Sequence, residues 1–238
     1  MSKKNILVTG VSTGLGHALA EKYLHSGDEV YGLSRREPED LVELGLHHLS
    51  VDMGQGEKAS REFVDFLPFN EDWDVVYLNA GKLGEIRDMA DTPLEDLRET
   101  MEINVWANKW LLDALFSVSG RVHQVVALSS GASQSGARGW NGYGISKAAL
   151  NMLTKLYAAE KSETHFCAFA PGLVNTAMQD YLTGDLDGEK FPIVARLRAT
   201  KGTEDMPTPS VCADKIIAAL PAIRRTESGS FQDIRKLK

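Results

Sequence analysis

The chain has 238 residues, of which 43% are hydrophobic and 25% are charged, values typical of a globular protein. Its formal net charge of −7 argues against a nucleic acid or an anionic membrane as the main partner. Cys167 and Cys212 lie in apolar surroundings without metal-ligand spacing, which favours no metal site and a reducing, cytoplasmic compartment. No apolar run approaches the ~20 residues that a transmembrane helix requires.

The first predicted elements indicate a dinucleotide site at a strand-to-helix junction. Residues 5–9 form an apolar run typical of a buried parallel strand, and residues 17–24 have helical spacing. Between them, Gly10 permits a tight turn and Gly14 lets backbone N–H groups approach a pyrophosphate at the helix N-terminus. Gly16 allows the helix to pack closely on the sheet. A purely structural turn is the alternative, but the strand–glycine–helix order favours dinucleotide binding.

The second predicted strand, residues 29–33, ends where such a site handles the adenosine ribose of its cofactor. An Asp or Glu there would accept the ribose hydroxyls and repel a 2′-phosphate. This chain has Ser34-Arg35-Arg36 instead, and arginine binds phosphate with its planar fork. We therefore expect a preference for NADP(H) over NAD(H), with Ser34 and Arg35 at the phosphate. A basic loop on the surface of an acidic protein is the alternative.

Strand-like and helix-like segments continue to alternate to the end of the chain, which predicts a single-domain, doubly wound parallel α/β sheet of about seven strands with helices on both faces. Ligands should bind at the carboxyl ends of its strands. Residues 177–209 have weak periodicity and glycines, which predicts a mobile substrate-binding lid. The other predicted strands are 46–51, 75–78, 122–128, 165–170 and an edge strand near 229–231; the other predicted helices are 57–67, 93–118, 143–160 and 210–220.

Two capping signals set helix ends in this prediction. Gly27 ends the first helix as a C-cap. Thr92 is the expected N-cap of the helix 93–118, with Glu95 completing a capping box. Asp52, at the end of the third strand, either accepts a hydrogen bond from an adenine amine or initiates a turn.

Tyr143 and Lys147 stand four residues apart and would project from one helix face, one turn apart. A free tyrosine has a pKa near ~10, and a neighbouring ammonium would lower it and make the phenol usable for proton transfer. On spacing alone, an ordinary surface pair is the alternative. Ser129 and Ser130 end the fifth strand; adjacent strand residues face opposite sides, and the spacing to Tyr143 favours Ser130 for the site.

Taken together, these residues resemble the short-chain dehydrogenase/reductase family over about residues 4–231. The family's TGxxxGxG motif is found at residues 9–16, and its YxxxK pair is Tyr143 and Lys147. The NNAG segment corresponds to residues 78–81, although Leu78 replaces the first asparagine, and the PG turn begins at Pro171. Thr13 stands where many NADP-dependent members carry a basic residue.

The resemblance implies an NAD(P)-dependent oxidoreductase that transfers hydride between the nicotinamide and a carbonyl or secondary alcohol. Ser130 would bind the carbonyl oxygen, Tyr143 would pass the proton, and Lys147 would hold the nicotinamide ribose. Asn104 would be the fourth catalytic residue and anchor a water, and Thr176 would contact the carboxamide. The expected cofactor contacts are Gly10, Ser12, Thr13, Gly14, Leu15, Gly16, Ser34, Arg35, Asp52, Met53, Asn79, Ala80, Gly81, Tyr143, Lys147, Pro171, Gly172, Val174 and Thr176.

The same resemblance implies a homodimer or homotetramer formed through the helices 93–118 and 143–160. A catalytically silent NADP(H)-binding sensor is the alternative function, although all four catalytic positions are filled. A sugar-nucleotide epimerase is disfavoured by the GxxxGxG spacing and by the few residues after the sixth strand. The expected substrate is a medium-sized ketone or aldehyde, an aromatic one among the options, in a pocket for which the candidates are Arg138, Trp140, Tyr181 and Phe191.

Overall fold

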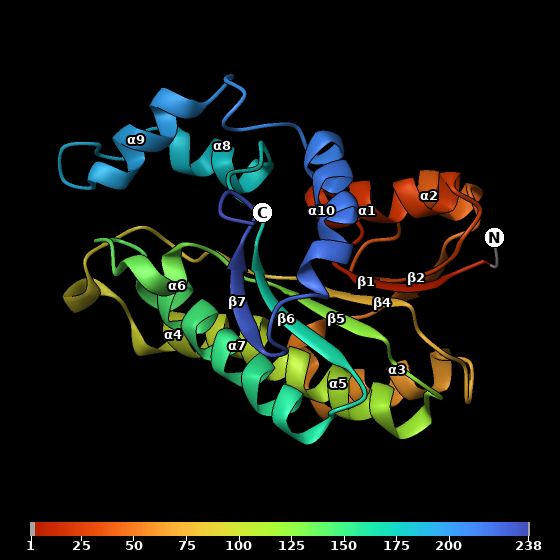
Figure 1. Ribbon diagram of the computed structural model, residues 1–238. Helices are drawn as coiled ribbons and strands as arrows, with labels where there is room; N and C mark the ends of the chain where they lie inside the picture. The colour runs from red at the N-terminus through yellow and green to blue at the C-terminus, as the bar shows by residue number, and fades with distance from the viewer. Residues whose placement is uncertain (1–2, 238) are drawn as a thin grey trace.

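The computed structural model describes residues 3–237 and contains a seven-stranded sheet. Its order is β3-β2-β1-β4-β5-β6-β7, and every neighbouring pair of strands is parallel (Figure 1). The predicted parallel sheet of about seven strands is therefore confirmed, including its last edge strand. The strands are β1 (Asn5–Thr9), β2 (Glu29–Ser34), β3 (His47–Ser50), β4 (Val75–Leu78), β5 (Gln124–Leu128), β6 (His165–Ala170) and β7 (Ser230–Asp233).

Helices cover both faces of the sheet. Their bounds are α1 (Gly14–His25), α2 (Glu39–Glu43), α3 (Glu57–Phe66), α4 (Leu94–Met101), α5 (Ala107–Val118), α6 (Ala132–Ser135), α7 (Asn141–Glu160), α8 (Ala177–Thr183), α9 (Pro192–Thr200) and α10 (Pro209–Ile223), with short 3₁₀ turns η1 (Met53–Gln55) and η2 (Met89–Asp91) and a π-helical turn η3 (Glu102–Trp106). Figure 1 shows α1 and α10 on one face and α3, α5 and α7 on the other. No helix within residues 3–237 is long and apolar enough to cross a bilayer.

The central strands are buried on both sides, which explains why they read as continuous apolar runs. In β1, Ile6 and Val8 pack in the apolar cluster on the α1–α10 side. Leu7 points the other way and packs in the cluster that contains Phe63 and Leu111 of α3 and α5. Side chains alternate along a strand, so a strand between two helical layers needs apolar residues at every position.

The predicted capping box of the helix 93–118 is wrong. α4 begins at Leu94 with Pro93 in the N-cap position, and no side chain among the described residues caps it. Thr92 instead donates its hydroxyl to the Asp88 carbonyl at 2.9 Å and accepts from Asn141 at 2.6 Å. The same predicted helix is also interrupted by η3, so that α4 and α5 are joined through a π-helical turn.

Residues 177–209 contain two short helices in place of an irregular segment. α8 has 7 residues and α9 has 9, too few to give a clear period in the sequence. Figure 1 shows them lying together beyond the main body of the sheet. They share a small apolar cluster with the loop after β4, whose buried members are Ile86, Leu182, Phe191, Val194, Leu197 and Met206.

Candidate active site

A cavity of about 1250 Å³ lies at the carboxyl ends of the strands. Its walls come from the segments that follow β1, β2, β4, β5 and β6 and from α8 and α9. Every predicted cofactor contact except Gly16 lines this cavity, and so does Ser130. The topology explains the convergence, because the order of the strands reverses between β1 and β4 and leaves a crevice at that edge.

The glycine turn after β1 has the geometry that its sequence predicts. Gly10 and Gly14 have φ angles of +77° and +66°, which side-chain-bearing residues rarely adopt. A Cβ on Gly16 would lie 2.3 Å from the Gly10 carbonyl oxygen, so Gly16 supports the close packing of α1 behind the cavity wall. Within the described chain, no side chain caps the N-terminus of α1 and no acidic residue lies in its first turn. This helix end therefore keeps its positive dipole and N–H donors for an anion.

Asn79 joins the ends of β1 and β4. Its backbone N–H donates to the Thr9 hydroxyl at 2.9 Å, and its side-chain amide donates to the Thr9 carbonyl at 2.9 Å. The Thr9 hydroxyl also accepts from the Ala80 N–H at 2.9 Å. These bonds fix the floor of the cavity at the crevice between the two strands.

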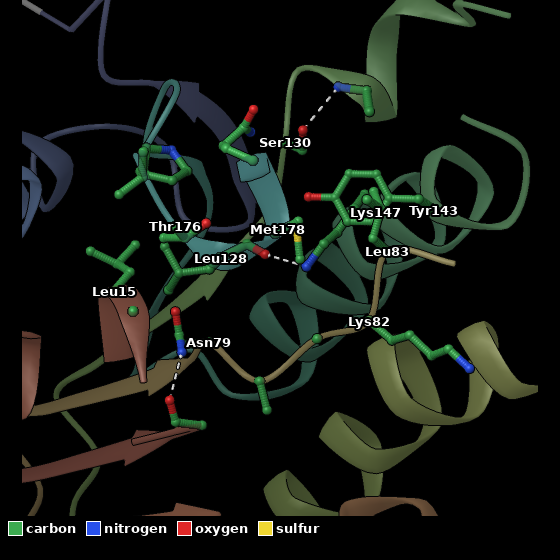
Figure 2. A pocket seen from close by; sticks show the side chains of 18 of the residues that line it. Leu15, Asn79, Lys82, Leu83, Leu128, Ser130, Tyr143, Lys147, Thr176 and Met178 are labelled. Carbon is green, nitrogen blue, oxygen red and sulfur yellow. Dashed lines mark hydrogen bonds between the residues drawn. The ribbon is translucent and has the colours of Figure 1, made fainter. Parts of the chain in front are cut away.

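Tyr143 and Lys147 both come from the first turns of α7 and face the cavity (Figure 2). The Lys147 ammonium lies 5.7 Å from the centre of the Tyr143 ring and donates to the Leu128 carbonyl at 2.7 Å, as the dashed line in Figure 2 marks. The Ser130 hydroxyl accepts from the Ala132 N–H at 3.1 Å, and its interaction with the phenol acts to lower the pKa of Tyr143. The neighbouring Ser129 hydroxyl is engaged elsewhere, because it donates to the Asn151 side chain at 2.6 Å.

The expected direction of the tyrosine pKa shift is wrong. Burial raises the pKa of Tyr143 above its ordinary value, and the hydrogen bond from Ser130 offsets only part of that increase. Burial also lowers the pKa of Lys147 to about 8, because the ammonium is removed from water. The Lys147 ammonium donates its hydrogen bond to the Leu128 carbonyl and not to the phenol. Desolvation of the Tyr143 phenol therefore has a larger effect on its pKa than the charge of the lysine.

Asn104 is fully buried in η3, behind the cavity wall. Its amide nitrogen donates to the Lys82 carbonyl at 2.8 Å and to the Ser146 hydroxyl at 2.9 Å, while its oxygen accepts from the Lys82 N–H at 2.7 Å. It therefore ties the loop after β4 to α7. A Cβ on Gly81 would lie 3.2 Å from the Asn104 oxygen and 3.5 Å from the Lys147 nitrogen, so both flank this glycine.

At the other end of the cavity, Ser34, Arg35 and Arg36 follow β2 and all three line the wall. The Ser34 hydroxyl donates to the Arg36 carbonyl at 2.7 Å and contacts the His48 ring nitrogen at 2.9 Å, so it shapes the loop. Asp52 accepts from the Gly54 N–H at 3.0 Å and thus initiates η1, the second of the two roles that its sequence position allowed.

Only one of the four candidate substrate-pocket residues, Trp140, lines the cavity. Arg138 binds the Asp88 carboxylate at 2.6 and 2.8 Å, and this contact lowers the pKa of Asp88 to about 2. The Tyr181 hydroxyl accepts from the Ile86 N–H at 3.2 Å, and Phe191 is buried in the cluster under α8 and α9. The wall also contains residues that were not expected from the sequence, among them Met178, Gln179, Ile193, Arg196 and Arg235.

These wall residues were not expected from the sequence for two different reasons. Four of them lie on α8 and α9, whose short helices gave no period to place a face. Arg235 follows β7, and a signal for it did exist: a residue just beyond a parallel strand lies at the ligand-binding edge.

Comparisons with known proteins identify the family. A family model described as "short chain dehydrogenase" matches residues 4–187 of the chain. Benzil reductase ((S)-benzoin forming) of Bacillus subtilis is 29% identical over 97% of this chain and 98% of its own length. An uncharacterised oxidoreductase of Schizosaccharomyces pombe is 32% identical over 79% of this chain and 78% of its own.

Solved structures agree with this assignment at the level of the fold. A short-chain dehydrogenase/reductase from Saccharomyces cerevisiae superposes with a TM-score of 0.85 at 24% identity, covering 98% of this chain and 96% of that one. A serine dehydrogenase in its closed form, complexed with NADP⁺, gives a TM-score of 0.77 at 20% identity, covering 96% and 93%. The chain therefore belongs to the short-chain dehydrogenase/reductase family and is an NAD(P)-dependent oxidoreductase.

Proposed function

We propose that this enzyme reduces a medium-sized ketone, an aromatic one by preference, with NADPH as the hydride donor. The observation that carries the proposal is the meeting of Ser130, Tyr143 and Lys147 in a cavity at the strand ends. The relatives named benzil reductase support the aromatic ketone, since benzil is an aromatic diketone. Trp140, whose ring centre is 5.6 Å from that of Tyr143, gives the cavity an aromatic wall.

The residues present fit a nicotinamide dinucleotide. The uncapped N-terminus of α1, reached through Gly10 and Gly14, suits a pyrophosphate. A Cβ on Gly14 would lie 3.4 Å from the Thr176 side chain, an ordinary contact, so the φ angle of +66° is what favours a glycine there. In the proposal, Thr176 contacts the carboxamide and Lys147 binds the nicotinamide ribose.

NADPH, when bound, supplies the hydride that reaches the carbonyl carbon. The Ser130 hydroxyl donates a hydrogen bond to the carbonyl oxygen and holds it near the phenol. Tyr143 then passes its proton to that oxygen. Its raised pKa suits this direction, because the phenol is fully protonated at neutral pH. Lys147, with a pKa of about 8, is mainly cationic at pH 7 and stabilises the phenolate that remains.

The proposed proton relay to solvent passes Asn104. This residue fixes the Lys82 backbone and, like Lys147, lies close to Gly81. We assign it a positioning role toward the lysine, with a bound water as the link that the family resemblance implies.

Preference for NADPH over NADH is proposed from the wall after β2. Arg35 and Arg36 both line the cavity there, and neither position carries a carboxylate that would repel a 2′-phosphate. Ser34 lies close by, although its hydroxyl is bonded to the Arg36 carbonyl. Thr13 adds no positive charge, so the preference depends on the two arginines.

We also propose a single catalytic domain whose residues 177–209 form the substrate lid. Residues of α8 and α9 line the cavity and pack on Ile86 through their own apolar cluster, separate from the two clusters that flank the sheet. A homodimer or homotetramer through α5 and α7 is proposed from exposed apolar side chains on that side. Two buried free thiols, Cys167 and Cys212, fit a cytoplasmic location.

The test of the function is Tyr143→Phe. We expect the rate of NADPH oxidation with aromatic ketones to fall about 10²-fold or more, because the proton donor is lost. Binding of NADPH, followed by fluorescence, and the melting temperature should stay close to those of the wild-type protein. Near-normal turnover in this variant would remove the mechanism, and a wild-type protein that binds NADPH without reducing any carbonyl would favour the sensor instead.

A further inference from the structure

Arg235 reaches the cavity from the end of the chain. It follows the edge strand β7 and lines the cavity wall. Its terminal nitrogen Nη2 lies 3.7 Å from the point where a Cβ on Gly131 would stand. Gly131 is the neighbour of Ser130, whose hydroxyl contacts the phenol of Tyr143. The guanidinium therefore lies near the backbone that follows Ser130, the residue proposed to hold the reacting carbonyl oxygen.

Asp233 fixes the orientation of this guanidinium. The Arg235 Nε donates to one Asp233 carboxylate oxygen at 2.8 Å and Nη2 donates to the other at 2.5 Å. The Arg235 backbone N–H adds a third bond at 3.0 Å. Asp233 itself is only 7% exposed. A guanidinium that forms two parallel hydrogen bonds with a carboxylate has little rotational freedom. The Arg235 guanidinium is therefore oriented before any substrate binds.

The sheet sets where the pair stands. Asp233 pairs with Ala170 in the parallel register of β6 and β7, and the Ile234 N–H donates to the Ala170 carbonyl at 3.0 Å. The Ile234 side chain comes within 3.5 Å of the Cβ position of Gly172, in the turn after β6. The tail thus packs against the cavity wall between the turns that follow β5 and β6.

Arg235 has N–H donors that Asp233 does not use. Two of its N–H groups bind Asp233, and the others have no hydrogen-bond partner within residues 3–237. A guanidinium remains charged at any working pH and prefers carbonyl, carboxylate or phosphate oxygens. With one substrate oxygen at Ser130 and Tyr143, these unpaired donors on a residue of the same cavity wall could bind a second oxygen acceptor on the adjoining carbon.

We propose that Arg235, positioned by Asp233, binds the second oxygen of a vicinal dicarbonyl substrate, a 1,2-diketone or a 2-oxo acid, and so determines specificity for this class. The inference rests on the proposed carbonyl reduction and names the substrate class of that same site. The chemical step is unchanged: hydride adds to one carbonyl carbon, and its oxygen takes the proton from Tyr143.

The experiment compares benzil, which has two adjacent carbonyls, with deoxybenzoin, which has the same skeleton and one carbonyl. Benzoylformate serves as the 2-oxo acid. The variants are Arg235→Met, Arg235→Lys and Asp233→Asn, with Arg225→Met as a control at an exposed arginine outside the cavity wall. Melting temperature and NADPH fluorescence verify that each variant folds and keeps its cofactor site.

We expect Arg235→Met to lower kcat/KM for the dicarbonyl substrates about tenfold, mostly through KM, because a charge-assisted hydrogen bond at a half-exposed site is lost. Deoxybenzoin should change less than about twofold, since it offers no second acceptor. Arg235→Lys should restore part of the loss, and Asp233→Asn should show a smaller loss of the same kind. The larger loss, with benzil or with benzoylformate, identifies which of the two sources the site favours.

Two results overturn the inference while leaving the proposed function intact. The first is an equal loss, or no loss, with benzil and deoxybenzoin in Arg235→Met. The second is a wild-type enzyme that reduces deoxybenzoin but no vicinal dicarbonyl. A wild-type protein that reduces no carbonyl compound at all overturns both proposals together.

Discussion

At the scale of single residues, Lys147 is an amine that the fold keeps away from water. Burial lowers its pKa from 10.5 to about 8, so the folded protein opposes the charged form. Below pH 8 both the folded and unfolded chains hold the proton, and the full penalty acts on stability. Between about pH 8 and 10.5 the unfolded chain binds more protons than the folded one, so the folded state gains stability as the pH rises.

This increase of stability with pH gives a prediction for Lys147→Met. Relative to the variant, the wild-type protein should gain about 3 kcal/mol in free energy of unfolding as the pH is raised through that window, since one pKa unit corresponds to about 1.4 kcal/mol. Urea titrations at several pH values measure it. Lys155→Met, at an exposed lysine of the same helix, is the control and should track the wild type. A difference between wild type and Lys147→Met that stays flat with pH would contradict the burial argument.

The cofactor preference is also decided by single residues. Arg35→Ala should lower the ratio of kcat/KM for NADPH over NADH about tenfold, because one charge-assisted contact to the 2′-phosphate is lost. The double variant with Arg36→Ala should lower it further, since both residues line the wall. Arg61→Ala, at an exposed arginine of α3, is the matched control. A wild-type enzyme that prefers NADH would contradict the assignment of the phosphate site.

At the scale of elements, the contact between α1 and the end of β1 depends on the absence of one side chain. A Cβ on Gly16 would lie 2.3 Å from the Gly10 carbonyl oxygen and 2.4 Å from the Asn79 amide nitrogen. Because the first obstacle is backbone, α1 itself must move. The N–H groups at the start of that helix would then leave their place at the proposed pyrophosphate site.

Gly16→Ala should therefore lower the free energy of unfolding by about 1–3 kcal/mol, the usual cost of overpacking. It should also weaken NADPH binding, which isothermal calorimetry measures directly. Gly54→Ala is the control, since its added Cβ would meet its nearest neighbour at an ordinary 3.4 Å. Equal stability and equal affinity in Gly16→Ala and wild type would rule out the tight packing described here.

The interruption of the helix between Leu94 and Val118 is a second point at the scale of elements. The sequence predicted one continuous helix over residues 93–118, and the structure divides it at the π-helical turn η3. Asn104 lies in this turn, and asparagine is an unfavourable residue inside a long helix. The structural role of Asn104 depends on its hydrogen bonds with Lys82 and Ser146, which are both distant in sequence.

At the scale of the whole molecule, α5 and α7 and the turn before α5 leave large apolar side chains in solvent. Trp106 and Trp110 are 44% and 36% exposed, and Met152 and Leu156 are 56% and 54% exposed. Large exposed apolar side chains are often found at an interface between subunits. Together with the family resemblance, this supports the proposed homo-oligomer through that side.

Leu156→Glu should therefore produce a smaller species than the wild-type protein in light scattering after gel filtration. A buried carboxylate without a partner opposes association. Circular dichroism should remain that of the wild type, because the side chain does not belong to the core. Leu44→Glu, at an exposed leucine after α2, is the control and should leave the size unchanged. A wild-type monomer at high concentration would contradict the proposal.

The sequence by itself determined the sheet, the glycine turn and the residues that end each strand. These features are local: buried strands need continuous apolar runs, and positive φ angles at Gly10 and Gly14 need glycine. Parallel strands then bring their carboxyl ends to one edge, so Ser130, Tyr143 and Lys147 could be expected near the cofactor contacts, and they line one cavity. The spacing of Tyr143 and Lys147 placed both on one helix face for the same local reason.

Only the tertiary structure decided the pKa values of the buried side chains, the positions of α8 and α9 and the entry of Arg235 into the cavity. Burial, which no local pattern states, raises the pKa of Tyr143 and lowers that of Lys147. The positions of α8 and α9 are set by packing on Ile86, from a distant loop. Arg235 enters the cavity because β7 pairs in register with β6, an event between segments about 60 residues apart. Desolvation and register both arise from contacts across the chain, and a linear sequence does not contain their distances.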